Sequence, residues 1–523
     1  MLFLLNADVI DSERPELKMS SMKKTFMTGV IAAAGKGTRA YPRTTFIPKP
    51  LFAFENKSLL ERNIEIQIKI FKVKKLYILV GHLKDIVEGE VDRLRKKFPG
   101  VKIETALWTK KGLASDVASL RDRIDGDFSL ILGDEFYLNT DHDYMLKSWN
   151  SKKNPAAMIA TLNTNFISDI RKNYSVELEK DRVVQLYEKP QTPQNTLLGL
   201  GSYMFSREYF DYFDKTKPSS RSGVVELTDV IDLMASDSKR VYSSLLKGRY
   251  YNINSLADYY TVNYLLRSEK FAKYKTSLVI PVLNNEFTIS DVISDFKKDV
   301  NEIIVVDMGS KDQTKKIVKS LPVKLLDGSS KKNKVGIHYA PSIYNAMHQA
   351  KGDIIVLAAG DGSFRARDLP KLLEYLKDCD MVVGTRTTRQ MMEQGANLNS
   401  LYRWLNVALG KLVEIFWWDQ EPRFTDIGCI YRAIWKDSFE KISPDLIVKD
   451  KTFSVEMMIE IVRYHMRCIE IPISFYRSYG IIAEEKIKAQ FFYLISVLLL
   501  VFSKKFRIFS FLIKNNSNKS RTT

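Results

Sequence analysis

The sequence predicts an α/β protein built from two tandem domains and a short helical tail. Three observations lead to this prediction: strand–helix alternation in the first half, the same alternation in the second half, and a different, apolar and basic pattern at the end. Alternation of this kind implies mostly parallel sheets covered by helices. The 523 residues are 45% hydrophobic and 27% charged, which is typical of a globular chain and argues against disordered, collagen-like or multi-span membrane proteins.

Folded patterning in the first half begins near Lys23, and we expect the first domain to cover residues 23–270. Short apolar runs predict its strands and 3.6-residue periodicity predicts its helices. The expected strands are Gly29–Ala33, Leu76–Val80 and Ser129–Leu132, and the helices include Leu59–Phe71 and Leu83–Lys97.

The second domain is expected over residues 275–480, after a charged join near Leu265–Lys275. It repeats the same alternation of elements. The expected strands are Ser277–Pro281, Glu302–Asp307, Asp353–Leu357 and Met381–Gly384, and the helices include Ile289–Lys298, Ile343–Ala350 and Leu369–Leu376.

The two ends differ from these domains. Residues 1–22 are expected to form an N-terminal arm, because Met1–Leu5 is too short an apolar run for a secretion signal and Met22 would serve equally well as a start. In the tail, residues 481–523, the apolar run Phe491–Phe502 would extend only about 18 Å as a helix against a hydrocarbon thickness of ~30 Å. Cations and aromatics follow this run, so a helix in the headgroup region and a helix packed on the second domain both remain open.

The formal net charge of +18 suggests an anionic partner, such as nucleic acid, anionic lipid or phosphorylated small molecules. No RNP-type, zinc-finger or helix-turn-helix signature accompanies the cations, so nucleic acid is not favoured. The three cysteines, Cys379, Cys429 and Cys468, form no CxxC pair, which indicates a reducing compartment. We therefore expect a cytoplasmic protein, peripheral at the cytoplasmic face of the membrane.

The strongest local motif is Ala-Ala-Gly-Lys-Gly-Thr-Arg, which begins at residue 33 and is followed by Pro-Lys-Pro at residue 48. It follows a predicted strand, where a glycine-containing loop brings backbone N–H groups close to a phosphate. Gly35, Gly37 and Thr38 are therefore the expected nucleotide-binding residues. Arg39 offers a planar charged fork to phosphate oxygens, and Lys49 offers a mobile point charge.

This motif resembles the signature of the sugar-phosphate nucleotidylyltransferases, and the resemblance extends through the first half of the chain. It implies that Asp134, in Leu-Gly-Asp, holds Mg²⁺ near the α-phosphate. It also implies that Glu188 and Lys189 bind the sugar phosphate. Asn252 stands where the family usually has a second Mg²⁺-ligating aspartate, and an amide oxygen binds a hard cation less strongly than a carboxylate.

The implied reaction is attack of a sugar-1-phosphate oxygen on the α-phosphorus of a nucleoside triphosphate, with release of pyrophosphate. Arg39 would contact the triphosphate and Lys49 the α-phosphate region. Glu226 and Asp229 match a further family segment, although capping of the following helix is the favoured interpretation. The sequence does not determine the base of the nucleoside triphosphate. It also does not determine the group that is activated, which is a sugar phosphate or another phosphorylated alcohol.

A second set of motifs resembles the inverting family-2 glycosyltransferases, including the dolichyl-phosphate mannose synthases, over residues 275–480. An expected strand ends in Asp307 before Met-Gly-Ser, and the later segments include Gly360-Asp361-Gly362-Ser363 and Thr425-Asp426. Together, the two resemblances imply two Rossmann-like domains of the GT-A type.

By this resemblance, Asp307 binds the nucleoside and Asp361 binds the metal–diphosphate, with Mg²⁺ or Mn²⁺. Arg386 and Arg403 receive the phosphate of a polyprenyl phosphate acceptor. Asp426 is the candidate general base if the acceptor is instead a glycan hydroxyl. A purely structural role stays open for two of these residues: Asp426 could cap a helix or turn, and Arg403 could lie on a solvated helix face.

Two departures from the family pattern leave the second domain's activity open. Met308 replaces one acid near the base, and Ala359 replaces the first acid of Asp-x-Asp. The expected function is bifunctional: synthesis of a nucleotide sugar, and transfer of a glycosyl group to a lipid-linked or cell-surface glycan acceptor. The alternative is an active nucleotidylyltransferase with a non-catalytic module for binding or membrane recruitment.

Overall fold

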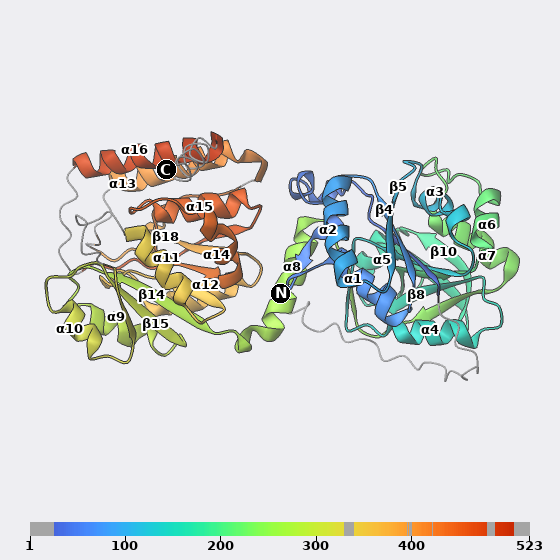
Figure 1. The fold of residues 1–523 in the computed structure, drawn as a ribbon, viewed down its shortest axis with the longest axis horizontal. Helices are drawn as coiled ribbons and strands as arrows, with labels where there is room; N and C mark the ends of the chain where they lie inside the picture. Colours follow the sequence, from blue (N-terminus) through green and yellow to red (C-terminus); the bar gives the residue numbers. More distant parts are fainter. Residues whose placement is uncertain are drawn as a thin grey trace, which may run out of the picture. The chain divides into compact units, whose positions relative to one another are not determined.

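In the computed structural model, runs of β-branched and aliphatic residues form two buried sheets, one in each half of the chain (Figure 1). The structure describes residues 26–328, 339–394, 396, 400–420, 422–478 and 487–506. The chain divides into two units between Val262 and Asn263, within a helix. The expected 1–22 arm and the expected tail residues 481–486 and 507–523 lie outside the described residues.

The first unit contains a nine-stranded sheet in the order β5-β4-β1-β6-β11-β8-β12-β10-β9. Strands β5, β4, β1 and β6 are parallel, whereas β11 runs antiparallel to both β6 and β8. The strands are β1 (Thr28–Ala32), β4 (Lys75–Val80), β5 (Lys102–Leu107), β6 (Phe128–Leu132), β8 (Ala157–Asn163), β9 (Tyr174–Glu179), β10 (Arg182–Glu188), β11 (Leu197–Phe205) and β12 (Val241–Leu245).

The expectation of a mostly parallel sheet is therefore wrong for this unit, because the strands from β8 to β12 add antiparallel pairs and the hairpin β9–β10. The helices are α1 (Leu59–Glu65), α2 (Lys84–Lys97), α3 (Leu113–Ala118), α4 (His142–Ser151), α5 (Ile167–Lys172), α6 (Tyr209–Lys215), α7 (Leu227–Ser238) and α8 (Leu256–Lys270). Two small sheets pair β2 (Ala53–Phe54) with β3 (Lys57–Ser58) and β7 (Glu135–Leu138) with β13 (Arg249–Asn252).

The second unit contains a seven-stranded sheet in the order β16-β15-β14-β17-β19-β18-β20. Only β19 runs antiparallel to its neighbours, so the mostly parallel expectation holds here. The strands are β14 (Thr276–Val282), β15 (Glu302–Asp307), β16 (Lys324–Asp327), β17 (Ile354–Leu357), β18 (Met381–Thr385), β19 (Arg432–Trp435) and β20 (Cys468–Pro472). The helices are α9 (Ile289–Phe296), α10 (Thr314–Lys319), α11 (Tyr339–Gln349), α12 (Leu369–Leu376), α13 (Ser400–Phe416), α14 (Lys436–Ile442), α15 (Phe453–Arg463) and α16 (Ile487–Phe506).

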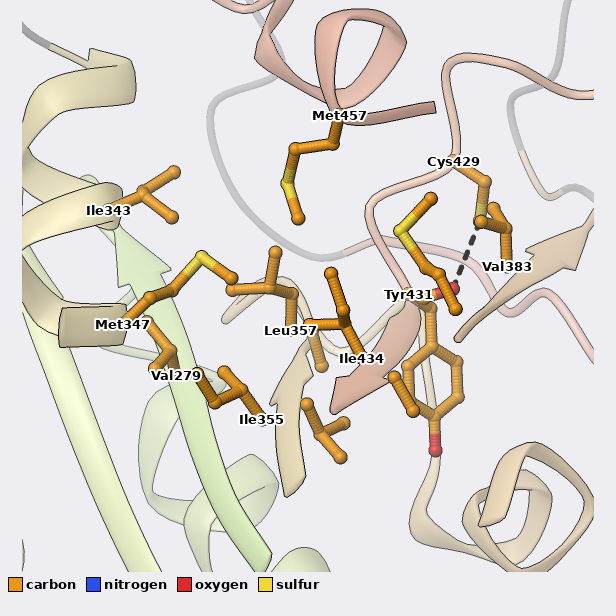
Figure 2. Packing of buried hydrophobic residues seen from close by; sticks show 14 of the residues in the cluster. Val279, Ile343, Met347, Ile355, Leu357, Val383, Cys429, Tyr431, Ile434 and Met457 are labelled. Carbon is orange, nitrogen blue, oxygen red and sulfur yellow. Dashed lines mark hydrogen bonds between the residues drawn. The ribbon is translucent and has the colours of Figure 1, made fainter. Parts of the chain in front are cut away.

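One large hydrophobic core holds the second unit together. Figure 2 shows side chains of α11 and α15, among them Met347 and Met457, beside those of the central strands, among them Val279 and Leu357. Close packing of this kind fixes the strand ends rigidly, and the loops that follow those ends carry the candidate site residues. The mixed α/β fold expected from the sequence is confirmed.

Helix α16 contributes to this core through Val497, Leu500 and Val501, which are almost completely buried. Among the residues that the structure describes, no helix is long and apolar enough to cross a membrane. All three cysteines are free, and burial raises the pKa of the Cys429 thiol to about 12.

Candidate active sites

A pocket of about 330 Å³ opens in the first unit, where β1 and β6 end side by side. Its walls combine loop backbone, two cations, two carboxylates and one indole ring. The lining residues are Ala32, Ala33, Ala34, Gly35, Gly37, Lys49, Pro50, Leu79, Trp108, Lys110, Gly112, Leu113, Asp116, Leu132 and Asp134. The carboxyl end of a parallel sheet is where open α/β folds bind ligands.

Lys49 and Asp134 meet inside this pocket, with 2.6 Å between Lys49 Nζ and Asp134 Oδ2. The Lys49 side chain is only 9% exposed, whereas that of Asp134 is 31% exposed. Gly37 holds the loop against Lys49 in a left-handed conformation (φ 62°), and a Cβ there would lie 2.9 Å from Lys49 Cγ. The loop glycine therefore makes the space in which the lysine stem lies.

Gly35 differs from Gly37, because a Cβ at Gly35 would meet no atom within 4 Å. Its backbone faces open space, as required of a residue that a phosphate approaches closely.

Arg39 lies at the exposed edge of the same loop, next to Thr38 in a short 3-10 turn. Its Nη2 donates a hydrogen bond of 2.7 Å to Oδ1 of Asn254, which orients the guanidinium. His82, which follows β4, forms a 2.8 Å hydrogen bond between its Nε2 and the Thr44 carbonyl oxygen. His82 thus braces the loop by a backbone contact.

Glu188 ends strand β10 and Lys189 follows it, and these are the two residues expected to bind the sugar phosphate. Lys189 is half-exposed and lies 3.6 Å from Glu188 Oε1, and Arg221 approaches the same oxygen at 3.5 Å. The Lys189 backbone N–H donates to the Asn173 carbonyl oxygen at 2.7 Å. The Asn173 side chain in turn accepts a 2.6 Å hydrogen bond from Asn252 Nδ2.

Asn252 thus links the Lys189 segment, through Asn173, to the segment that contains Asp134. The next residue, Ile253, donates its backbone N–H to the Asp134 carbonyl oxygen at 2.9 Å. Oδ1 of Asn252 is buried and has no hydrogen-bond partner. The unpartnered amide oxygen of Asn252 and the partly exposed carboxylate of Asp134 are both oxygen ligands of the kind that Mg²⁺ takes, so the residues present fit this ion together with substrate oxygens and water.

Glu135, directly after Asp134, is fully buried and accepts hydrogen bonds from Tyr137 Oη, Tyr250 Oη and the Gly201 N–H. Burial raises the pKa of this carboxyl to about 7. A Cβ at Gly201 would lie 2.4 Å from Glu135 Oε1, so this glycine admits the carboxyl into the core. These hydrogen bonds of Glu135 hold the backbone next to Asp134, the expected metal ligand.

Glu226 and Asp229, in contrast, form a capping box at the start of α7, with the Glu226 N–H donating to Asp229 Oδ2 at 3.3 Å. The favoured capping interpretation is confirmed.

In the second unit, β14, β15, β17 and β18 all point the same way, so their carboxyl ends share one edge of the sheet. Asp307 ends β15, Asp361 follows β17 and Arg386 follows β18. Asp307 is buried and accepts hydrogen bonds from the backbone N–H groups of Gly309 and Ser310 at 3.3 and 3.2 Å. It therefore shapes the turn that follows the strand.

Asp361 holds its own turn in a similar manner, because its Oδ1 accepts from both the N–H and the hydroxyl of Ser363. Ala359, two residues earlier, is partly buried against the core and brings no ligand atom. Among the described residues, no three His, Cys, Asp or Glu side chains gather as a metal cluster. A metal at this edge would take Asp361 as a single protein carboxylate, together with diphosphate oxygens.

Arg386 and Asp426 form a buried pair. Two guanidinium nitrogens of Arg386, Nε and Nη2, lie 2.7 and 2.8 Å from the two carboxylate oxygens of Asp426, and the Arg386 backbone N–H donates at 2.9 Å. Glu470 of β20 accepts hydrogen bonds from the backbone N–H groups of Thr425 and Asp426. Burial raises the pKa of the Glu470 carboxyl to about 7.

Arg403 lies on α13, with its guanidinium carbon 5.9 Å from the centre of the Trp404 ring.

Comparison with known proteins agrees with both sets of motifs. Residues 28–269 match the nucleotidyl transferase family model, and residues 277–439 match glycosyl transferase family 2. The chain thus carries an N-terminal nucleotidyl transferase domain and a C-terminal glycosyl transferase family 2 domain, and it is a transferase. The two family resemblances expected from the sequence are confirmed.

Its curated relatives are sugar-1-phosphate nucleotidyltransferases. UTP–glucose-1-phosphate uridylyltransferase AglF of Haloferax volcanii is 28% identical over 223 residues, covering 42% of this chain and 89% of the relative. Bifunctional protein GlmU of Methanococcus aeolicus is 35% identical over 209 residues, covering 39% of this chain and 46% of the relative. The chain thus spans about half the length of the GlmU relatives. A solved structure of UDP-glucose pyrophosphorylase with UDP-glucose is 22% identical, covering 48% of this chain and 99% of that one, with a TM-score of 0.40.

Three residues that shape these sites carry no motif in the sequence. Asn173 joins Lys189 to Asn252, Asn254 orients Arg39, and Glu470 supports the Asp426 loop. Each acts through a partner far along the chain, so nothing in its own neighbourhood marks it.

Proposed function

We propose that the protein is a bifunctional enzyme that makes a nucleotide sugar and then uses a nucleotide sugar as glycosyl donor. The two domains would cover residues 23–270 and 275–480, each of the GT-A type. The single observation that carries this proposal is the Lys49–Asp134 pair, with 2.6 Å between Nζ and Oδ2, in a pocket that the glycine loop lines. This pair would present a cation to the triphosphate and a carboxylate to the metal.

In the first reaction, the chain's own residues mainly position and neutralise charge. The loop backbone at Gly35, Gly37 and Thr38 would receive the triphosphate, with Arg39 at its exposed end. Lys49 would lie against the α-phosphate, and Glu188 and Lys189 would orient the sugar phosphate. Because the attacking phosphate oxygen already carries negative charge, no general base is needed.

Asp134 and Asn252 would hold Mg²⁺. When bound, this ion offsets charge on the triphosphate and favours departure of pyrophosphate. Lys49 already contacts one oxygen of Asp134, so the lysine and the metal would share this carboxylate, and triphosphate binding would draw Lys49 toward phosphate.

In the second reaction, a glycosyl group would pass to a polyprenyl phosphate or a glycan acceptor. Asp307 would contact the nucleoside, Asp361 the diphosphate with Mg²⁺ or Mn²⁺, and Arg386 and Arg403 the acceptor phosphate. A lipid-linked acceptor agrees with a cytoplasmic protein that is peripheral at the membrane. The synthesis of cell-envelope polysaccharide is the pathway class that uses such chemistry.

The deciding experiment is a pyrophosphate-release panel with Mg²⁺, in which CTP, UTP, GTP and dTTP are each combined with phosphorylated sugars and alcohols. UTP with glucose-1-phosphate is the first pair, because the relative AglF is named for these substrates. We expect one pair to release pyrophosphate well above all others. No release from any pair would refute the nucleotidylyltransferase assignment.

A second candidate function is specifically favoured by Ala359 and Met308, which lack the acids of the family pattern. In that case the second domain binds nucleotide sugar or recruits the protein to membranes without catalysis. Glycosyl transfer to polyprenyl phosphate, compared between the wild type and Asp361→Ala, separates the two candidates. Transfer that Asp361→Ala abolishes supports catalysis, whereas no transfer by either protein supports the binding module.

A further inference from the structure

Helix α16 is apolar on both of its sides. One side, with Val497, Leu500 and Val501, is buried in the core of the second unit. The opposite side exposes five large hydrophobic residues at alternating spacings of three and four, so they form one stripe along the helix. These residues are Phe492, Ile495, Leu499, Phe502 and Phe506, between 36% and 67% exposed.

Helix α13 packs beside α16 within the same unit, and Figure 1 shows both helices along one edge of it. The ring of Phe416 on α13 lies 5.1 Å from that of Phe502 and 6.3 Å from that of Phe506. The α13 segment exposes three more large side chains: Trp404, Ile415 and, just after the helix, Trp418, between 62% and 70% exposed.

We call the eight exposed residues on α16 and the α13 segment the apolar face. They make up eight of the nineteen large hydrophobic side chains that are exposed in the described part of the chain. Such concentration on two adjacent helices differs from the scattered exposed hydrophobics of an ordinary surface and marks an interaction site.

The charge of the surrounding sequence selects the partner. From residue 484 to residue 523 the sequence contains eight cations and two acids, Glu484 and Glu485. Lys504 is paired inside the unit, and the other seven cations are Lys486, Lys488, Lys505, Arg507, Lys514, Lys519 and Arg521. Anionic lipid headgroups complement this charge, whereas a second copy of the chain would bring two cationic segments together.

Helix α16 is also firmly attached to the unit. Lys504 Nζ is buried and lies 2.7 Å from Glu456 Oε1 and 2.8 Å from Glu460 Oε1, both on α15. It also donates to the Asp445 carbonyl oxygen at 2.5 Å. A membrane contact made by α16 would therefore hold the whole sheet of the second unit, not merely a loose tail.

We propose that the apolar face lies in the headgroup region of an anionic membrane, with α13 and α16 parallel to its plane. This proposal rests on the proposed glycosyl transfer to a lipid-linked acceptor, because it gives α13, the helix of Arg403, direct access to a polyprenyl phosphate in that membrane. The aromatic residues would enter the interface, and the net positive charge of the surrounding sequence would favour anionic lipid.

The test uses the full chain in vesicle sedimentation, with vesicles of phosphatidylcholine alone and vesicles that also contain phosphatidylglycerol. The test variant is Phe492→Ser with Leu499→Ser, since both side chains are exposed. The matched control is Tyr375→Ser, an exposed aromatic residue on α12 of the same unit. We expect the wild type and the control to bind the anionic vesicles and the double variant to bind about tenfold or more weakly.

Equal binding by the double variant, or no vesicle binding by the wild type, would overturn the proposal. Gel filtration adds a further outcome: a wild-type dimer that the double variant disrupts would assign the face to a second copy instead. Pyrophosphate release is measured on the same preparations and is expected to be unchanged in every variant. Its absence would contradict the proposed function, independently of the vesicle result.

Discussion

Arg386 and Asp426 hold each other through a bidentate ion pair that is almost completely buried. Both carboxylate oxygens of Asp426 are engaged by the guanidinium, and one of them also accepts the Arg386 backbone N–H. A general base needs a lone pair directed at the acceptor hydroxyl, and here the pair with Arg386 competes for it. The geometry therefore shows a guanidinium held in place by Asp426, and it does not favour proton abstraction by Asp426.

The first prediction separates these two roles of Asp426. In Asp426→Asn, the amide nitrogen opposes the guanidinium, so Arg386 loses its orientation. We expect the KM for a polyprenyl phosphate acceptor to rise about tenfold or more, and Arg386→Lys to act in the same direction because lysine lacks the bidentate fork. Pyrophosphate release by the first domain provides the internal control. A variant that loses the acidic limb of the pH–rate profile with unchanged KM would instead identify Asp426 as the base.

The second prediction concerns the pair Lys49 and Asp134. Lys49→Met removes the buried cation beside the expected α-phosphate, and Asp134→Asn removes the carboxylate. Each is expected to lower kcat for pyrophosphate release by about a hundred-fold or more, the scale typical of losing a charge-stabilising group. Lys96→Met, an exposed lysine on α2, is the matched control and should leave the rate unchanged. A loss of less than tenfold in both variants would contradict the assignment of this pocket.

The third prediction compares the two loop glycines. Gly37→Ala places a Cβ 2.9 Å from Lys49 Cγ at a positive φ of 62°, so we expect both a lower unfolding temperature and a lower kcat. Gly35→Ala meets no neighbouring atom, so its stability should stay at the wild-type level. Its KM for the triphosphate should nevertheless rise about tenfold, because the methyl group occupies space that a phosphate would use. An unchanged KM in Gly35→Ala would mean that the triphosphate does not approach this residue.

The fourth prediction is a pH dependence of stability. The pKa of Glu470 is raised from 4.5 to about 7 in the folded protein, mainly by burial. Between these values the folded state keeps a proton that the unfolded state has lost, so the free energy of unfolding falls as the pH rises through this window. In the wild type, Glu470 should make the free energy of unfolding higher at pH 5 than at pH 8 by at most about 3 kcal/mol, and in Glu470→Gln this part of the difference should be absent.

The control for this measurement is Glu440→Gln on α14, whose side chain is exposed. Denaturant unfolding at each pH gives the slopes. A Glu470→Gln slope equal to that of the wild type would show that Glu470 titrates normally.

The fifth prediction concerns the attachment of α16. Lys504→Met leaves the buried carboxylates of Glu456 and Glu460 without their shared cation. Removing one partner of a buried ion pair costs roughly 3–5 kcal/mol, so we expect a marked drop in the unfolding temperature of the second unit. Lys441→Met, an exposed lysine on α14, should have almost no effect. Equal unfolding temperatures for the two variants would indicate that α16 contributes little to this unit.

Elements bounded by clear turn residues could be predicted to the residue. Strand β15 (Glu302–Asp307) and helix α12 (Leu369–Leu376) begin and end where their patterns predict. The antiparallel strands β9, β10 and β11 were not predicted, because they follow one another without a helix and so leave no strand–helix alternation to read. Tertiary pairing, rather than local pattern, builds that half of the sheet.

The sites divide in the same way. Lys49 and Asp134 lie in motifs that are continuous in the sequence, and the structure brings the two residues together in one pocket. Asn173 and Glu470 could not be predicted from such motifs, because their partners lie 79 and 45 residues away, at Asn252 and Thr425. Contacts of this range depend on how the chain packs, and no local spacing encodes them.

The position of α16 also implies an order in which the two units fold while the protein is being synthesised on the ribosome. The strands of the first unit all lie between Thr28 and Asn252, so this unit can fold while the remainder is still being translated. The second unit needs Val497, Leu500 and Val501 to fill its core and Lys504 to neutralise two buried carboxylates. Until residue 504 has left the exit tunnel, the core of that unit is incomplete and its apolar surface is exposed, although all its strands have been made.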